Sequence, residues 1–201
     1  MKYTAKTFSI PELKGLSSKQ IEIHLALYEG YVKHVNLIMD TLKQYANYGD
    51  KASEGDKLAI AELRRRLGFE FDGMRMHEYY FEQLEGGAVG ARTDSALAQA
   101  VSEKYGDWDS FMSHVKQVAG TRGIGWVITY ADPRASTIHS TFVSDHELGQ
   151  LAGLPILLAV DLWEHAFMVD YVPAEKKTYV EAFLENVNWS VVEDRFVEAS
   201  R

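Results

Sequence analysis

The sequence predicts an α+β protein: helices fill the first half, and a small antiparallel sheet with flanking helices follows. As far as residue 118, apolar residues recur at helical spacing. After Gly120 the pattern changes to short β-branched and aromatic runs that are bounded by turn signals such as Asp132-Pro133. Helices that precede strands, instead of alternating with them, are typical of α+β folds or of two separate domains.

Two long helices are predicted in the first half. Ser17 or Ser18 can cap the first one, because a serine side chain accepts a hydrogen bond from a free amide at a helix start. The second is expected over residues 57–84, with a break near Gly68 and an end before Gly86-Gly87.

Shorter elements are expected in the rest of the chain. They are helices at 95–104 and 107–118, a hairpin of strands at 126–130 and 137–143, a strand at 156–161, and two helices near 179–183 and from 190. We predict two units, a helical one over residues 1–88 and a mixed one over residues 89–201, divided near the glycines of 84–90.

The composition excludes several classes of function. The chain has 201 residues, 46% of them hydrophobic, which is enough to form a core. It has no cysteine, which excludes disulfides and thiolate sites and fits a reducing compartment. The net charge of −8 argues against general nucleic-acid binding. The start of the chain does not resemble a signal peptide, and the apolar stretch 151–160 is too short for a membrane span. A cytoplasmic protein without nucleic-acid or membrane partners is therefore expected.

Three aromatic-rich stretches carry candidate metal ligands. His24 lies in Ile-Glu-Ile-His-Leu, His77 in Met-His-Glu-Tyr-Tyr, and Asp161 and His165 in Asp-Leu-Trp-Glu-His. Three imidazoles and one carboxylate suit iron or manganese, although zinc is compatible with the ligand types. Each histidine taken alone also fits a buried core residue, so spacing alone does not establish a site. A non-haem iron oxygenase is an alternative, which the helical first half disfavours.

The segment Asp161-Leu-Trp-Glu-His-Ala-Phe167 closely resembles the D-x-W-E-H-A signature of the iron/manganese superoxide dismutases. Other segments resemble that family too: 21–24 with Tyr31, 77–81, 123–126, and 188–189 with 195–196. The resemblance implies a helical hairpin domain followed by an α/β domain with a small antiparallel sheet. It also implies that superoxide is converted to dioxygen and hydrogen peroxide by a homodimer or tetramer. A metal-binding relative with little dismutase activity is the alternative.

The resemblance also implies the roles of individual residues. One metal ion per subunit, iron slightly favoured over manganese, is expected on His24, His77, Asp161 and His165. Tyr31 corresponds to the gateway tyrosine, and Trp126 and Trp163 correspond to aromatic walls around the metal. Glu164 corresponds to the residue that reaches the last histidine ligand of a partner subunit. His146 is expected to contact the metal-bound solvent where many members use a glutamine, because Gly73 stands at one of the two glutamine positions.

Some positions depart from the usual family pattern. Leu27 stands where a channel histidine is common, and Met168 stands where a tyrosine of the proton relay is common. The spacing from His24 to Tyr31 is one residue shorter than in common members. These departures together suggest a variant subgroup with histidine in place of the active-site glutamine. An acidic protein that binds an anion needs local positive charge, for which Lys33, Arg75, Arg122 and Lys176 are candidates that the sequence does not rank.

Overall fold

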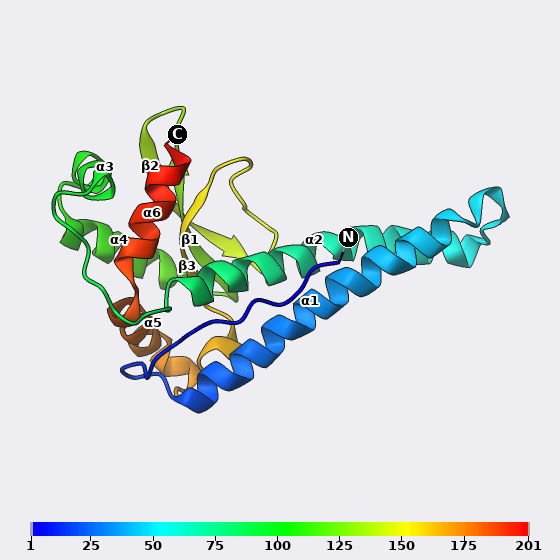
Figure 1. Cartoon of the computed structure of the whole chain (residues 1–201), viewed down its shortest axis with the longest axis horizontal. Helices are drawn as coiled ribbons and strands as arrows, with labels where there is room; N and C mark the ends of the chain where they lie inside the picture. Colours follow the sequence, from blue (N-terminus) through cyan, green and yellow to red (C-terminus); the bar gives the residue numbers. More distant parts are fainter. Residues whose placement is uncertain (1, 201) are drawn as a thin grey trace.

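The computed structural model describes residues 2–200 and confirms the predicted fold class (Figure 1). The helices are α1 Ser18–Ala46, η1 Gly49–Lys51, α2 Glu54–Glu82, α3 Ala96–Tyr105, α4 Trp108–Ala119, η2 Glu164–Ala166, η3 Pro173–Glu175, α5 Lys176–Asn186 and α6 Trp189–Ala199, where η denotes a 3-10 turn. The strands are β1 Gly125–Asp132, β2 Thr137–Ser144 and β3 Ile156–Asp161.

Helices α1 and α2 form a long antiparallel hairpin whose tip projects away from the rest of the molecule (Figure 1). The Ser17 side chain caps α1, as predicted. Helix α2 begins at residue 54, a little earlier than expected, because Ser53 and Asp56 form a capping box there. The expected break at Gly68 was wrong, since α2 continues through it. One interior glycine costs a helix only about 1 kcal/mol, which packing against α1 can offset.

The other predicted helices are present, with small differences at their ends. Ser95 caps α3 and Asp107 caps α4, each by accepting a hydrogen bond from a backbone amide in the first turn. The chain's last two helices start slightly earlier than expected, α5 at residue 176 and α6 at residue 189.

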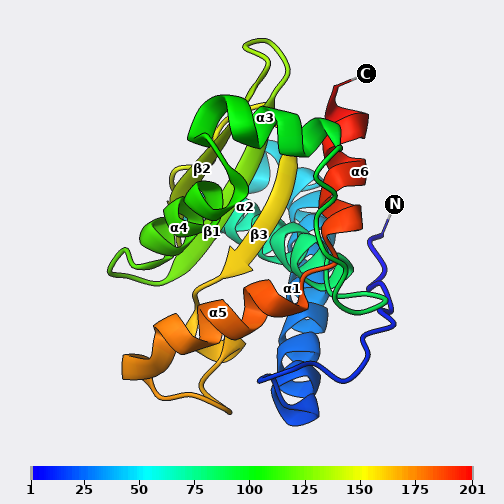
Figure 2. The same cartoon turned by 90° about the vertical axis from the view of Figure 1, so that its left-hand side faces the viewer.

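The sheet has the order β2-β1-β3, and both pairs of strands are antiparallel. The predicted hairpin of β1 and β2 and the predicted third strand are therefore confirmed. Helices α2 and α6 pack against β3, whereas α3 and α4 lie on the β2 side of the sheet (Figure 2). Asp161, the last residue of β3, pairs with Trp126 of β1. This register brings the end of β3 to the place where the helical hairpin meets the sheet.

Within residues 2–200, none of the helices combines the length and the apolar character that crossing a bilayer requires. The division of the chain at residues 88 and 89 stays a prediction.

Candidate metal centre

Four side chains converge where α1, α2 and the end of β3 meet. Helix α1 supplies His24, α2 supplies His77, β3 ends in Asp161, and the turn η2 supplies His165. One ligand-type atom from each residue lies within 4.8 Å of all the others. From Asp161 Oδ2, the Nε2 atoms of the histidines are 3.1 Å (His24), 3.2 Å (His165) and 3.6 Å (His77) away.

Neighbouring backbone groups orient two of these side chains. The other oxygen of Asp161, Oδ1, accepts a hydrogen bond from the Trp163 backbone N–H at 2.8 Å, which leaves Oδ2 to face the histidines. His77 Nδ1–H donates to the Gly73 carbonyl at 2.6 Å, so Nε2 carries the free lone pair. That Nε2 is buried and has no hydrogen-bond partner among the described residues. A buried acceptor nitrogen without a donor is expected for a metal ligand when the ion is absent.

The electrostatics keep the candidate ligands in the protonation states that metal binding requires. Burial lowers the pKa of His24, and burial together with the charge of His24 lowers the pKa of His77 further. Burial acts to raise the pKa of Asp161, but the charges and hydrogen bonds of His165 and His24 outweigh it and hold that pKa well below its usual value. At neutral pH the cluster therefore has one carboxylate anion and at least two neutral imidazoles.

The donor set fits a transition-metal ion. Atoms that each lie about 2.0–2.2 Å from one ion are about 3–4 Å from each other, which matches the three separations above. Imidazole and carboxylate ligands without a thiolate suit iron or manganese. The fold and the cluster thus fit a mononuclear metalloprotein whose candidate ligands come from two helices, a strand end and the turn η2.

A hydrogen-bonded chain of three aromatic residues lies beside this cluster. The indole Nε1–H of Trp126 donates to His146 Nδ1 at 3.0 Å, and His146 Nε2 is 2.7 Å from the Tyr31 hydroxyl oxygen. Burial lowers the pKa of His146 to about 4, so the ring is neutral at pH 7 and has a single N–H. Because Nδ1 accepts from Trp126, the N–H is on Nε2 and donates to Tyr31. The rings of Trp126 and Tyr31 also pack on His77, at 5.2 and 5.1 Å.

The loop after β2 turns His146 inward. Asp145 adopts a left-handed conformation with φ of 52°, which aspartate tolerates better than most residues. Ser144 and Leu148 exchange two backbone hydrogen bonds and close the loop. His146 is fully buried as a result, so it is not a solvent-exposed loop residue. Its expected contact with a metal-bound solvent molecule stays a prediction.

The remaining predicted residues lie at the edge of the cluster. The Trp163 ring stacks on both His146 and His165, at 4.9 and 5.7 Å, and its indole N–H donates to the Asp145 carbonyl. Glu164 is exposed, and its contact with a partner subunit stays a prediction. Leu27 and Met168 are exposed apolar side chains.

Gly73 has a packing role that the sequence did not indicate. A Cβ atom at this position would lie 2.7 Å from the ring of Tyr31. The Tyr31 ring therefore occupies the space that a glutamine at position 73 would need. This packing is consistent with the prediction that His146, and not residue 73, supplies the polar group near the cluster.

Two other residues near the site were missed. Gln20 is fully buried, donates to the His165 carbonyl at 2.6 Å and accepts from the Val169 amide, so it ties the segment after Asp161 to α1. Its position four residues before His24 was the available signal, because residues four apart share a helix face. Phe69 packs on His146 with ring centroids 4.6 Å apart, and nothing in its sequence context distinguished it.

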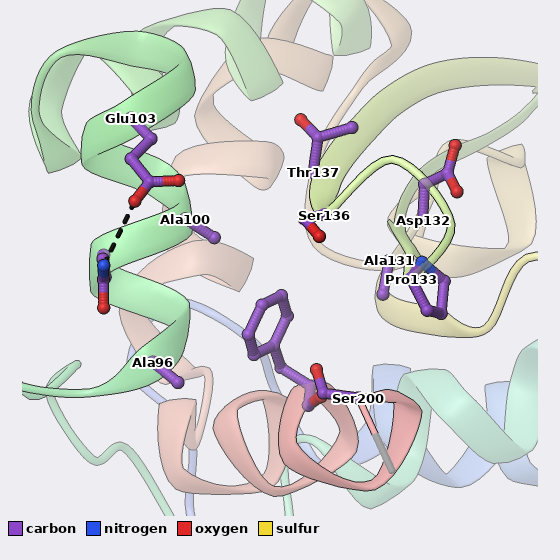
Figure 3. Close-up of a pocket in the computed structure, with 11 residues that line it drawn as sticks. Ala96, Ala100, Glu103, Ala131, Asp132, Pro133, Ser136, Thr137 and Ser200 are labelled. Atoms are coloured by element: carbon purple, nitrogen blue, oxygen red, sulfur yellow. Dashed lines mark hydrogen bonds between the residues drawn. The ribbon is translucent and has the colours of Figure 1, made fainter.

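A surface pocket at the far end of the sheet is separate from the metal cluster (Figure 3). It is lined by α3, by the turn between β1 and β2, and by the end of α6, with Glu103 and Asp132 among its polar residues. Asp132 is the last residue of β1, whereas Trp126 at the other end of that strand contacts His77. The pocket therefore plays no part in the ligand geometry.

Comparison with known proteins agrees with this geometry. Residues 93–195 match the model of the iron/manganese superoxide dismutases, C-terminal domain. The chain is 32% identical to an iron superoxide dismutase of Aquifex aeolicus, in an alignment that covers 94% of this chain and 88% of the relative. It is also 32% identical to an iron superoxide dismutase of Cupriavidus metallidurans, over 94% and 93% of the two chains. A manganese superoxide dismutase of Halobacterium salinarum is 27% identical over 88% and 84%.

The chain belongs to the iron/manganese superoxide dismutase family, as the D-x-W-E-H-A resemblance predicted.

Proposed function

We propose that this protein is a superoxide dismutase that uses one iron or manganese ion per subunit. The observation that carries the proposal is the convergence of three imidazole Nε2 atoms and one carboxylate oxygen in a buried position, in a chain of this family. His24, His77, Asp161 and His165 are the proposed ligands, and iron is slightly favoured over manganese.

A bound iron or manganese ion supplies one-electron redox chemistry, so that one superoxide is oxidised to dioxygen and a second, with two protons, is reduced to hydrogen peroxide. The ligands supply a single negative charge from Asp161, which leaves a divalent or trivalent ion with net positive charge for an anionic substrate. The surrounding rings of Trp126 and Trp163 exclude bulk water from the ligand atoms.

Tyr31 is the proposed proton donor nearest to the site. Because His146 Nε2–H donates to the Tyr31 oxygen, the phenol hydrogen is free to point elsewhere, including toward a substrate beside His77. Burial raises the pKa of Tyr31, which keeps the phenol protonated at neutral pH. His146 is thus proposed to hold Tyr31 in a donating orientation. Because Nδ1 accepts from Trp126, the predicted contact of His146 with solvent bound at the metal would require Nε2–H to turn from Tyr31 toward that solvent.

We also propose that the active form is a homodimer. Ile23 and Leu27 of α1 and Met168 and Val169 after η2 are exposed apolar side chains. Gln20 joins α1 to the 165–169 segment by two hydrogen bonds, so these side chains belong to adjacent parts of the surface. Covering them with a second copy would bury apolar area next to His165 and would bring Glu164 of one subunit toward the partner.

Two further points complete the proposal. The absence of cysteine favours a reducing compartment, so a cytoplasmic, antioxidant role is proposed. The helical unit over residues 1–88 and the mixed unit over residues 89–201 are proposed to be the two domains, with ligands contributed by both.

The direct test is the His77→Ala variant, purified beside the parent protein and a His114→Ala control. His114 lies on α4 outside the ligand cluster. His77→Ala should lose stoichiometric metal and superoxide decay together, because a buried site with few ligands does not tolerate the loss of one. Full metal content with unchanged activity in this variant would refute the assignment. Stoichiometric metal without superoxide decay in the parent protein would instead favour the alternative, a metal-binding relative.

A further inference from the structure

Three half-buried rings surround the buried His146 on the side of the metal cluster nearest to α2. They are Tyr31, Phe69 and Trp163, which we call the aromatic rim. The three rings lie at 4.9, 4.6 and 4.9 Å from the His146 ring. Because the three rings are partly exposed whereas His146 is fully buried, the aromatic rim is the part of this region that an anion in solvent can contact.

The guanidinium group of Arg66 lies over one ring of the aromatic rim, that of Phe69. The Arg66 Cζ atom lies 3.8 Å from the centroid of the Phe69 ring, which is cation–π distance. Arg66 Nε–H donates to Glu70 Oε1 at 2.8 Å, and among the described residues this is the only hydrogen bond that the Arg66 side chain makes. Its two terminal nitrogens are therefore available to an anion, and 42% of the side chain is exposed to solvent.

The ion pair with the buried Glu70 carboxylate holds the Arg66 guanidinium in this position. The Glu70 side chain is only 5% exposed, so the carboxylate faces the protein while the guanidinium faces the solvent. The second carboxylate oxygen, Oε2, lies 3.5 Å from His34 Nδ1 on α1. The four-residue spacing of Arg66 and Glu70 on α2 places both on one helix face, so the pair is built into the helix.

Two of the other basic residues that could attract an anion have partners elsewhere. Arg75 pairs with Glu78 in a surface pocket that it shares with Lys6 and Glu82. Lys176 donates to the Thr121 carbonyl. Of the lysine and arginine charges, only that of Arg66 acts on the pKa values of both Tyr31 and His146, where it opposes the carboxylates. The charge of Arg66 therefore reaches both residues, although Asp161 acts more strongly on the pKa of each and Glu70 acts more strongly on the pKa of Tyr31.

We propose that Arg66 attracts small monoanions to the aromatic rim and so guides them toward the metal cluster of this acidic protein. The proposal rests on the proposed function for the identity of the natural anion, superoxide. A local cation raises the concentration of an anionic ligand near it even when the net charge is −8, because fields decay over about 8–10 Å in physiological salt.

The test compares Arg66→Gln, Arg66→Lys and an Arg64→Gln control in the iron-loaded full-length protein. Arg64 is exposed on the same helix, two residues and therefore about 200° away, so its replacement changes the net charge equally. Azide is the probe, and its dissociation constant is measured by spectroscopic titration at low and high ionic strength. Superoxide kcat/KM is measured in parallel, with iron content as a check on folding.

Arg66→Gln should weaken azide binding by about three- to tenfold at low ionic strength, because the variant lacks one unit of positive charge close to the anion. Azide binding by this variant should also depend less on salt than binding by the parent protein. Arg66→Lys and Arg64→Gln should stay close to the parent protein. Two results would overturn the proposal. The first is an azide dissociation constant in Arg66→Gln that equals that of the Arg64→Gln control. The second is an equal loss of azide affinity in Arg66→Lys, which would assign the effect to packing on Phe69. If the parent protein binds azide but does not remove superoxide, the proposed function fails while the test of Arg66 stands.

Discussion

At the scale of single residues, the most informative side chain is His146. Both ring nitrogens have partners, Trp126 on Nδ1 and Tyr31 on Nε2. These contacts assign one tautomer to a neutral ring and make His146 a donor toward Tyr31. The residue is not a ligand, so its effect on chemistry is separable from metal binding.

Replacing His146 by Ala should therefore leave the metal content nearly intact while lowering turnover. A polar residue that supports a metal site typically changes its properties by about 10–100-fold, and we expect a loss of turnover in that range together with a shift in the metal's reduction potential. Metal analysis, a superoxide assay and a redox titration measure the three quantities. Unchanged turnover and potential would exclude the role.

Burial of His146 should also make the free energy of unfolding of the metal-free protein depend on pH. The pKa of His146 is about 4 in the folded chain, because burial disfavours the cation, and about 6.5 when unfolded. The folded state therefore binds fewer protons in this window, so stability falls as the pH drops from 6.5 towards 4. His146→Gln should reduce this slope by up to about 1.4 kcal/mol per pH unit. Urea unfolding between pH 7 and pH 4.5 measures both slopes, and equal slopes would contradict the account.

At the scale of elements, the site depends on how closely α1 and α2 approach. Tyr31 lies seven residues after His24, which is two helical turns, so both face α2. Opposite them, Gly73 leaves room for the Tyr31 ring and offers its carbonyl to His77. A single glycine thus sets both the position of the proposed proton donor and the orientation of a ligand.

The Gly73→Ala variant should displace Tyr31, because the added Cβ would lie 2.7 Å from the ring. We expect lower turnover with metal retained, although alanine is the better helix former by about 1 kcal/mol. Gly30→Ala is the matched control, since that position on α1 has nothing within 4 Å of the added atom. It should keep full activity and gain stability. Equal behaviour of the two variants in kinetics and thermal melts would argue against this packing role.

Particular elements show what the sequence could and could not predict. Capping serines and the aspartate before α4 located helix starts well, because they act through neighbouring backbone amides. The helix break expected near Gly68 was wrong, because tertiary packing of α2 on α1 overrides the low helix propensity of one glycine. The four proposed ligands were inferred from a motif, and the structure brings them together. Phe69, Arg66 and Gln20 were not singled out, since their contacts near the cluster join elements that are distant in the chain.

At the scale of the whole molecule, the proposed homodimer concerns one exposed apolar face. The exposed side chains Ile23, Leu27, Met168 and Val169 lie near His165, whose imidazole is 19% exposed, the most exposed of the four proposed ligands. A partner on this face would complete the covering of the metal site.

Glu164→Ala should weaken dimerisation and lower metal affinity by about 10–100-fold, as is typical when a residue that supports a ligand is removed. Analytical ultracentrifugation across a dilution series, combined with metal retention, measures both effects. Glu29→Ala is the control, because it removes an exposed carboxylate on α1 outside the predicted interface residues. A parent protein that is monomeric and fully active at low concentration would contradict the prediction.

The central claim, a redox metal on His24, His77, Asp161 and His165, is tested most directly by titrating activity against metal content. The native protein is stripped and then reloaded in steps with iron or with manganese, and superoxide decay is measured at each occupancy. Activity should rise in proportion to bound metal, reach its limit at one ion per chain and be absent from the stripped protein. Superoxide decay that persists in the stripped protein would contradict the metal assignment. So would a protein that binds one ion per chain when reloaded with iron, and one when reloaded with manganese, but removes no superoxide in either form.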